Sequence, residues 1–236
     1  MIAKNKLFKT LLLIIALMLP FAGYAQDQYK VYKINGETVV YDYSEIDSIV
    51  IKNYTVVPIV EDCEYVDLGL SIKWATFNLG AKKVSDVGDY YAWGEIESKN
   101  VFTTENSETY DVNGIKDFAG NPDYDAAAYV LGEGWRMPTH EECEELSRNC
   151  LWEWTEINGK PGFKITGSTG KAIFLPAAGY KYGAYVSEDD TNGYYWSSTP
   201  DHSLVAYTLS FMKGDWCGGY ATGYRDIGCP IRPVHE

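Results

Sequence analysis

Residues that bind transition metals are scarce in this sequence of 236 residues. Its three histidines are scattered, and no two of its five cysteines form a Cys-x-x-Cys pair. Structural zinc sites need four such ligands at short, characteristic spacings. We therefore expect no metal site built from cysteine and histidine, and no cofactor.

Basic residues are also few. The sequence has 20 lysines and arginines against 33 aspartates and glutamates, which gives a formal net charge of −13 at pH 7. A surface of this charge repels the phosphate backbone of DNA or RNA. The composition therefore excludes nucleic acid as a partner.

Long apolar runs are absent except at the N-terminus. The run "LLLIIALMLPFAG" follows three lysines within residues 4–9 and ends in the small-x-small sequence Gly23-Tyr24-Ala25. This order is typical of a secretory signal peptide. We expect residues 1–25 to be removed on export, so that the mature chain begins at Gln26 and its charge falls from −13 to −16.

The alternative interpretation of this run is a single membrane anchor. A membrane-spanning helix needs about 20 apolar residues, and Pro20 interrupts this run before that length is reached. No later run is long enough to span a membrane, and no cysteine follows the cleavage site to carry a lipid. The sequence therefore predicts an exported protein that is secreted, periplasmic or on the outer cell surface.

The exported chain divides into a small N-terminal β module over residues 26–55 and a main domain over residues 61–236. In the first, strand-forming residues flank Asn35-Gly36, a strong hairpin signal, and a third short strand is expected near residue 50. So small a module buries little core by itself. The segment "VVPIVED" indicates an extended linker to the main domain.

Two helices are predicted in the main domain. In "DAAAYVLG", Asp125 is a suitable N-cap and Gly132 a suitable end. In "PTHEECEELSRNC", Thr139 and Glu142 have the spacing of a capping box, and acidic residues crowd the first turn. The second helix is the strongest local signal in the sequence.

The remaining motifs predict short strands and loops. We expect strands on both sides of Gly69, in the aromatic segment "GDYYAWGE", as a hairpin of "GFKIT" with "KAIFL", and in the alternating segment "VAYTLSF". The segment "GCPIRPV" is expected to be a closing strand at a sheet edge, where prolines are tolerated. Residues 97–124 are expected to form a long surface loop. These elements together predict an α+β fold with two short helices and a twisted, mostly antiparallel sheet.

All five cysteines lie in the exported part, where disulfides form, but their odd number leaves at least one unpaired. Cys143, Leu146 and Cys150 occupy one narrow face of the second helix. Residues seven apart on a helix lie about 10 Å apart along its axis, so Cys143 and Cys150 cannot bond to each other. We favour a pair between Cys217 and Cys229, because both lie in the C-terminal strand-and-loop region.

Four ordered motifs carry a resemblance to a known family. "GWRMPTHEE", "FLPAAGY", "GYYWSSTP" and "IRPV" resemble the Fibrobacter-type major paralogous domains, secreted bacterial domains with a C-type-lectin-like fold of the formylglycine-generating-enzyme branch. "YVDLGLSIKWATFNLGA" and "GDYYAWGE" are similar to the opening of the same family. The resemblance covers residues 61–236. The segment ending "SEIDSIVI" resembles a leader module attached to bacterial surface proteins.

The motif residues themselves favour structural roles. We expect Trp135, Met137 and Trp196 in the core, Arg136 to reach a carboxylate, and the serines that follow Trp196 to bond to the backbone. These residues therefore indicate the fold and give no information about the function.

The resemblance also implies a ligand-binding face. In relatives whose C-terminal part is diversified by retroelements, the strands and loops before the final "RPV" bind the ligand. Residues 201–203 and 213–225 correspond to that face here. The site residues predicted in this way are Asp201, His202, Lys213, Asp215, Trp216, Tyr220, Thr222, Tyr224 and Arg225.

The stretch "GDWCGGYATGYRD" supplies the aromatic residues of this face. Trp216, Tyr220 and Tyr224 are four apart, but the glycines between them, each costing roughly 1 kcal/mol in a helix, argue against a helix. Rigid aromatics among adaptable glycines are typical of binding loops. The alternative is that the aromatics pack over the end of the sheet and fix the loops.

One acidic segment has two interpretations. In "SEDDTN", Asp189, Asp190 and Asn192 have oxygen atoms that suit calcium. A solvated acidic loop is the other explanation and the commoner one, so we assign no metal ligand.

Three function classes follow from these observations. The first is a secreted or cell-surface module that binds a protein or a glycan. The second is a structural subunit of a bacterial surface assembly. The third is an enzyme like those of the formylglycine-generating branch, which depend on a close pair of reactive cysteines; Cys217 and Cys229 are twelve apart and do not match that motif. We therefore expect a binding protein without catalytic residues, and we assign no oligomeric state.

Overall fold

The computed structural model describes residues 28–32, 38–42, 64–214 and 221–236. Contacts within the chain divide it into two units, Met1–Val57 and Pro58–Glu236. The expected signal peptide lies outside the described residues. None of the helices in the described part of the chain has the length and apolar character that a membrane crossing requires.

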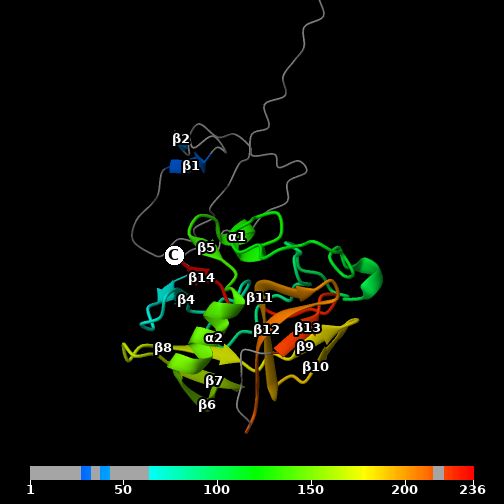
Figure 1. The fold of residues 1–236 in the computed structure, drawn as a ribbon. Coiled ribbons are helices and arrows are strands. Elements are labelled where there is room, and N and C mark those ends of the chain that lie inside the picture. The colour runs from blue at the N-terminus through cyan, green and yellow to red at the C-terminus, as the bar shows by residue number, and fades with distance from the viewer. Residues whose placement is uncertain (1–27, 33–37, 43–63, 215–220) are drawn as a thin grey trace, which may run out of the picture. The chain divides into compact units, whose positions relative to one another are not determined.

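In the first unit, β1 (Gln28–Tyr32) and β2 (Thr38–Asp42) form an antiparallel hairpin (Figure 1). Val31 lies opposite Val39, so the expected pairing is confirmed. The Asn-Gly turn and the expected third strand lie outside the described residues.

The second unit is α+β, as expected, with few helices and mostly antiparallel strands. Its helices are η2 (Thr104–Asn106), α1 (Ala126–Leu131) and α2 (His140–Asn149). Its strands are β3 (Tyr65–Val66), β4 (Lys73–Ala75), β5 (Trp135–Arg136), β6 (Leu151–Ile157), β7 (Lys160–Thr166), β8 (Ala172–Pro176), β9 (Tyr180–Tyr182), β10 (Tyr185–Ser187), β11 (Asn192–His202), β12 (Val205–Met212), β13 (Ala221–Tyr224) and β14 (Val234–His235).

Both predicted helices are confirmed, with the predicted caps. The carboxylate of Asp125 accepts hydrogen bonds from two backbone N–H groups of the first turn of α1, and Gly132 ends the helix with a φ of 82°. At the start of α2, the Thr139 hydroxyl accepts from the Glu142 N–H, and the Glu142 carboxylate accepts from the Thr139 N–H. Cap contacts reach only three residues along the chain, which is why the sequence predicts them well.

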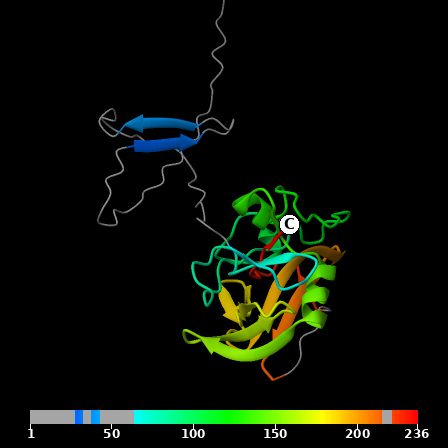
Figure 2. The same ribbon diagram turned by 90° about the vertical axis from the view of Figure 1, so that its left-hand side faces the viewer.

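The sheet of β11, β12 and β13 separates two hydrophobic cores. Tyr195 and Trp196 are neighbours on β11 and therefore point to opposite faces. Tyr195 packs with Leu209 and with residues of α2, β7 and β8, whereas Trp196 packs with Ala206 and with residues of α1. In both Figure 1 and Figure 2, α2 lies alongside β11 and β12.

The middle strand of this sheet departs from the predicted alternation. Val205 and Tyr207 were expected to be buried together with Leu209 and Phe211, but the buried positions change phase between Thr208 and Leu209. A hydrophobic core covers each face of the sheet. Side chains on both faces of β12 are therefore buried, and buried and exposed residues do not strictly alternate along it.

The closing strand is not at a sheet edge, contrary to expectation. β14 lies between β4 and β5 in the order β3-β4-β14-β5, and Val234 is opposite both Trp74 and Arg136. The prolines precede the strand. Proline has no backbone N–H group and can only accept hydrogen bonds. The carbonyl groups of Pro230 and Pro233 do so, from the N–H groups of Trp196 and Ala75.

Three other expectations about strands have different outcomes. The hairpin of β7 and β8 is confirmed, and β6 extends it to a three-stranded sheet that the sequence did not indicate. The segment "GDYYAWGE" is no strand: Tyr91 makes a single bridge with Cys229, and the aromatic side chains are buried in loops. The strands on both sides of Gly69 are confirmed as β3 and β4.

The core-forming motif residues are placed largely as expected. Met137 and Trp196 are buried, whereas Trp135 is only half-buried. Arg136 binds the Glu142 carboxylate through both terminal nitrogens, at 2.8 and 2.6 Å. The long loop of residues 97–124 runs over the surface but is anchored by the buried side chains of Phe102 and Phe118.

Candidate functional site

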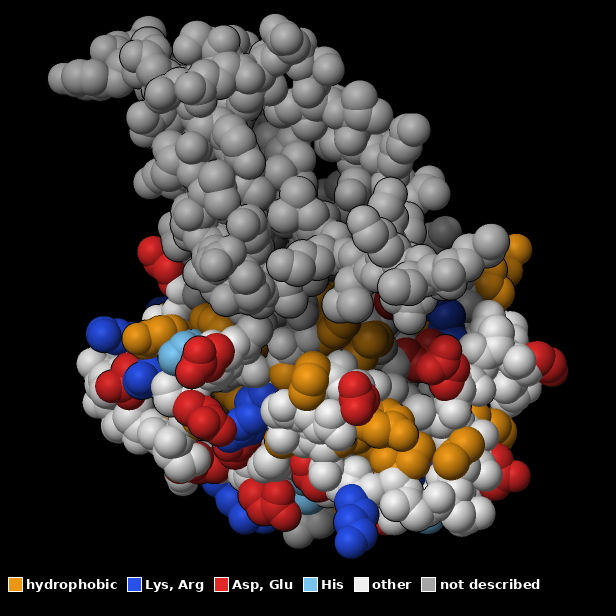
Figure 3. Space-filling model, turned by 90° about the horizontal axis from the view of Figure 1, so that it is seen from above, with side chains coloured by type: hydrophobic (Ala, Val, Ile, Leu, Met, Phe, Trp, Pro, Cys, Tyr) orange, Lys and Arg blue, Asp and Glu red, His pale blue; other side chains and the backbone are white. Residues whose placement is uncertain are grey.

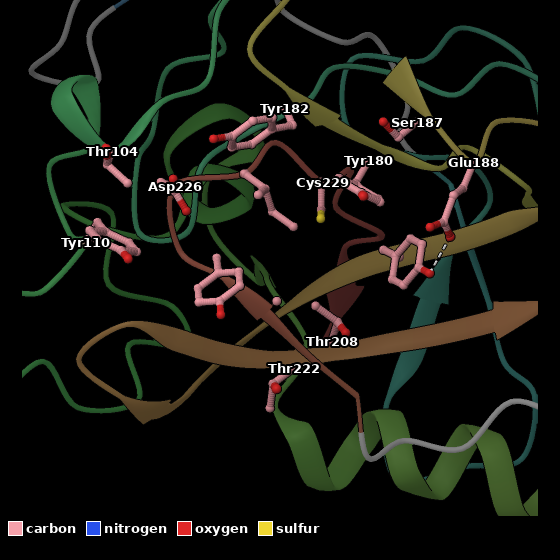
Figure 4. A pocket seen from close by; sticks show the side chains of 14 residues that line it. Thr104, Tyr110, Tyr180, Tyr182, Ser187, Glu188, Thr208, Thr222, Asp226 and Cys229 are labelled. Carbon is pink, nitrogen blue, oxygen red and sulfur yellow. Dashed lines mark hydrogen bonds between the residues drawn. The ribbon is translucent and has the colours of Figure 1, made fainter. Parts of the chain in front are cut away.

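A pocket of about 570 Å³ opens beside β13, between the β9–β10 hairpin and the loop that contains η2 (Figure 4). Five of its fourteen lining residues are tyrosines: Tyr110, Tyr180, Tyr182, Tyr194 and Tyr224. Hydroxyl groups of serine and threonine add further donors and acceptors. The lining is therefore aromatic and polar together, which is the composition of small-molecule sites.

The pocket lining contains two acidic residues, Glu188 and Asp226, and among the described residues that form it there is no lysine, arginine or histidine. Acidic and basic side chains are mixed, by contrast, on the face of the molecule drawn in Figure 3. The pocket thus has a negative bias of its own, which disfavours anionic ligands.

The Glu188 end of the pocket depends on a close turn. Gly179 has a φ of 57°, and a Cβ atom there would lie 2.0 Å from the Ser187 carbonyl oxygen. Only glycine permits this approach, which places the residues after β10 beside the start of β9. The Glu188 carboxylate then accepts hydrogen bonds from the Tyr194 hydroxyl, at 2.6 Å, and from the Asn192 amide.

Two aromatic rings form the wall at this end. The rings of Tyr180 and Tyr194 stand nearly perpendicular, with centroids 5.4 Å apart. Burial, together with the hydrogen bond to Glu188, raises the pKa of Tyr194 to about 12. The phenol therefore stays neutral and remains a hydrogen-bond donor to Glu188 at physiological pH.

The other end of the pocket contains a buried carboxylate. Asp226 follows β13 and is only 3% exposed. Figure 4 shows it between Tyr110 and Tyr182, near Thr104. Burial raises the pKa of Asp226, and the nearby Glu105 raises it further, while Lys99 opposes the shift.

A buried hydroxyl also lines the pocket. Thr208 on β12 is almost fully buried, and its Oγ1 atom has no hydrogen-bond partner among the described residues. An unsatisfied buried polar group costs about 1–3 kcal/mol. Such groups are uncommon in folded proteins and concentrate where a ligand or a functional constraint compensates for them.

The structure brings only part of the predicted face to this pocket. Thr222 and Tyr224 line it from β13, and Tyr224 is 58% exposed. Asp215, Trp216 and Tyr220 lie outside the described residues, so their assignment stays a prediction.

The predicted residues Asp201, His202 and Lys213 are exposed but do not line the pocket. The Asp201 carboxylate accepts a hydrogen bond from the Tyr207 hydroxyl at 3.2 Å. The Nε2 atom of His202 lies 3.9 Å from the Oδ2 atom of Asp201. These two residues are near Tyr224, because Val205 is opposite both His202 and Tyr224 in the sheet. Lys213 lies at the other end of β12.

Arg225 points into the protein and not onto the predicted surface face. Its side chain is 1% exposed. The guanidinium donates to the carbonyl groups of Thr109 and Val112, at 3.3 and 3.1 Å, and lies over the Trp93 ring. Tyr224 and Arg225 are consecutive, so when the first points outward the second points inward.

Sequence reasoning missed most of the pocket. Tyr110, Tyr180, Tyr182 and Tyr194 were not proposed, nor were the two carboxylates. One signal was present: tyrosines recur at 180, 182, 185 and 194, a density unusual for a core segment. Tyr182 and Tyr185 are indeed among the most exposed aromatics of the described chain, at 62% and 80%.

The acidic segment after β10 binds a lysine. Asp189 and Asp190 both hold the Lys160 ammonium group, with 2.7 Å between Lys160 Nζ and the Asp190 oxygen. The Asn192 amide turns instead to Glu188. Across the ranges that the structure describes, no three histidine, cysteine, aspartate or glutamate side chains gather in a way that could hold a metal ion.

The described cysteines are free thiols. Cys143 and Cys150 are not bonded to each other, as expected, but Cys150 does not lie on the helix as expected: α2 ends at Asn149, and Cys150 is its C-cap with an extended backbone. Cys229 is also free and fully buried below the pocket, so the expected pair with Cys217 is wrong. Burial raises the pKa of the Cys143 and Cys229 thiols, which keeps them protonated and poor as nucleophiles.

Comparison of the chain with models of known families, with curated proteins and with solved structures gave no match.

Proposed function

We propose that the chain is an exported ligand-binding protein that recognises a protein or a glycan through the tyrosine-lined pocket and the adjacent strand β13. The observation that carries this proposal is the exposure of Tyr182 and Tyr224 at a pocket of about 570 Å³. Tyrosine combines a large apolar face with a polar hydroxyl group and loses little entropy on binding. Exposed tyrosines around a concavity are therefore suited to recognition.

The second unit, in this proposal, has a C-type-lectin-like fold that supports the site. The motifs behind the resemblance supply much of the frame: "GWRMPTHEE" covers β5 and the start of α2, and "GYYWSSTP" lies within β11. Two motif residues also line the pocket, Tyr180 of "FLPAAGY" and Tyr194 of "GYYWSSTP". Arg232 of the closing motif is buried and donates to Asn78 and to the carbonyl groups of Ala75 and Phe174. A rigid frame of this kind leaves the surrounding loops free to vary.

Variants of the pocket rim test the proposed site. Screening of the mature protein on glycan and protein arrays identifies a ligand. The affinity of the variants Tyr182→Ser and Tyr224→Ser for this ligand, and their melting temperatures, are then compared with those of the unmodified protein. Exposed positions seldom change stability by more than about 0.5 kcal/mol, whereas an aromatic anchor commonly contributes about 2 kcal/mol to binding. We expect an unchanged melting temperature and a loss of binding.

The matched control is Tyr129→Ser on α1, a tyrosine of similar exposure that does not line the pocket. It should leave binding intact. Binding that survives both rim variants would remove the pocket from the proposal. A large loss of stability in either variant would instead identify that tyrosine as a packing residue.

Export is the second part of the proposal. Intact-mass measurement of the protein recovered outside the cytoplasm should give a chain that begins at Gln26. A mass that includes residues 1–25 would contradict cleavage at that position.

A structural subunit of a surface assembly is the alternative. The observation that favours it is β6, a seven-residue strand at the end of the β6-β7-β8 sheet, because an open edge can pair with another chain. Glu153 and Glu156 are exposed along this strand and oppose such pairing. Light scattering on the purified mature chain distinguishes the two, since assembly predicts species larger than a small oligomer. We do not propose catalysis, because the buried thiols of Cys143 and Cys229 are poor nucleophiles.

A further inference from the structure

The carboxylate of Asp226 is buried at the end of the pocket, and no cation of the described chain pairs with it. Among the described residues, no lysine, arginine or histidine forms an ion pair with Asp226, although it is only 3% exposed. Taking a charge out of water without a partner is unfavourable by several kcal/mol. The site therefore has one uncompensated negative charge.

The cations nearest to Asp226 are engaged elsewhere. The Lys99 ammonium group binds the Glu95 carboxylate at 2.6 Å and the Asn106 carbonyl at 2.8 Å. The guanidinium of Arg225 points to backbone carbonyl groups and to Trp93. The remaining charged neighbour, Glu105, is itself negative. Lys99 is near enough to oppose the rise in the pKa of Asp226, but no cation among the described residues forms an ion pair with that carboxylate.

Three tyrosines surround this carboxylate. Tyr110 and Tyr182 lie on two sides of Asp226 in Figure 4. Tyr224, two residues before Asp226 in the chain, also lines the pocket. These groups are close enough to interact electrostatically, since Asp226, Tyr224 and Tyr182 all raise the pKa of Tyr110 in addition to its burial. The faces of the three tyrosine rings attract cations.

We propose, on the basis of the ligand-binding function above, that this end of the pocket binds an alkylammonium group. The Asp226 carboxylate supplies the opposite charge, and the rings of Tyr110, Tyr182 and Tyr224 supply cation–π contacts. The chemistry is shared by small quaternary amines and by a lysine side chain of a partner protein. Glu188, at the other end of the pocket, adds to the attraction for a cation.

A neutral saccharide fits these observations less well. Its hydroxyl groups could bond to the tyrosine and threonine hydroxyls, but it would leave the charge of Asp226 uncompensated. Burying a carboxylate against an uncharged ligand makes its desolvation more complete. A cation removes this penalty, which is why we choose it.

The experiment is a titration of the mature protein with choline and with 3,3-dimethyl-1-butanol, followed by NMR or calorimetry. The two probes have the same shape and differ in charge. We expect choline to bind at least about tenfold more tightly than the alcohol, the factor that corresponds to about 1.4 kcal/mol. Equal binding of both probes, or no binding of choline and of the lysine probe below, would overturn the proposal.

Two variants assign the effect to this end of the pocket. Asp226→Asn keeps the shape and removes the charge, so the preference for choline over the alcohol should disappear. Tyr182→Ala should weaken choline binding, while the control Tyr185→Ala should not, because Tyr185 is an exposed tyrosine of the same hairpin outside the pocket. If Asp226→Asn unfolds, the comparison of Tyr182→Ala with Tyr185→Ala decides. An unchanged preference in a folded Asp226→Asn protein would contradict the assignment.

Two further probes distinguish a small amine from a lysine side chain as the source of the cation. They also distinguish failure of the ammonium proposal from failure of the ligand-binding function. Nα-acetyl-lysine methylamide represents a lysine side chain of a partner, and methyl α-glucoside represents a saccharide. Tighter binding of the lysine probe than of choline favours a protein partner. If only the glucoside or an array ligand binds, and Tyr182→Ser abolishes that binding, the ammonium proposal fails while the ligand-binding function stands.

Discussion

The guanidinium carbon of Arg225 lies 4.1 Å from the centre of the Trp93 ring, inside the protein. The same side chain donates to the carbonyl groups of Thr109 and Val112. Tyr110 lies between those two residues, and Tyr224 and Asp226 flank Arg225. The buried arginine therefore joins the two segments that form the Asp226 end of the pocket.

Replacement of Arg225 should destabilise the protein. Arg225→Met removes the cation–π contact and two charged hydrogen bonds, so we expect a loss of about 3 kcal/mol in the free energy of unfolding. The Thr109 carbonyl keeps the Val112 N–H as a donor, whereas the Val112 carbonyl loses its bond to the guanidinium. Arg225→Lys should lose nearly as much, because a single ammonium group cannot reproduce the planar fork. Urea denaturation measures both.

The control for this prediction is Lys213→Met, at an exposed cation close in the sequence. It should change the free energy of unfolding little. If Arg225→Met unfolds at the same urea concentration as the unmodified protein, the buried arginine has no structural role.

Stability should depend on pH through Asp226. Burial raises the pKa of Asp226 above its value in the unfolded chain, so the folded protein holds this proton more tightly. The free energy of unfolding must then fall as the pH rises from about 4 through the raised pKa. Asp226→Asn removes this dependence, and the variant should be more stable than the unmodified protein at pH 7.

Thermal unfolding of both proteins over a series of pH values checks this sign. The difference between them should shrink as the pH falls below about 4, where the carboxylate becomes protonated in the unfolded chain as well. Asp125, whose pKa burial also raises, is present in both proteins and cancels in the comparison. If Asp226→Asn is less stable than the unmodified protein at pH 7, a partner stabilises the ionised Asp226 and the predicted sign is wrong.

The cysteines should differ in reactivity. Cys150 is only half-buried at the end of α2, whereas Cys143 and Cys229 are fully buried. Burial raises the thiol pKa of all three, so the difference between them is one of access. Alkylation of the native protein followed by peptide mapping should therefore modify Cys150 first of these three. Modification of Cys229 in the native protein at the same rate would mean that the pocket floor opens to solvent.

The second unit should fold without the first. Residues Met1–Val57 and Pro58–Glu236 form separate compact units. We expect a chain without residues 26–55 to remain soluble and to keep a cooperative thermal transition. A broad, non-cooperative melt would show that the N-terminal hairpin belongs to the core of the second unit.

Local features of this protein were predictable from the sequence alone. The ends of α1 and α2 depend on contacts between residues at most four apart, such as Thr139 with Glu142. The hairpin of β7 and β8 depends on one short turn. The signals of these elements are complete within a few residues, so no knowledge of the fold is needed to read them.

The tertiary structure alone decided what forms the pocket. Tyr110, Tyr182 and Asp226 come from three segments separated by more than forty residues each, and no local spacing relates them. The inward direction of Arg225 and the central position of β14 likewise follow from packing partners distant in the chain. Long-range packing sets which side of a strand meets a core and which meets solvent, and a periodic pattern shows only that the two sides differ.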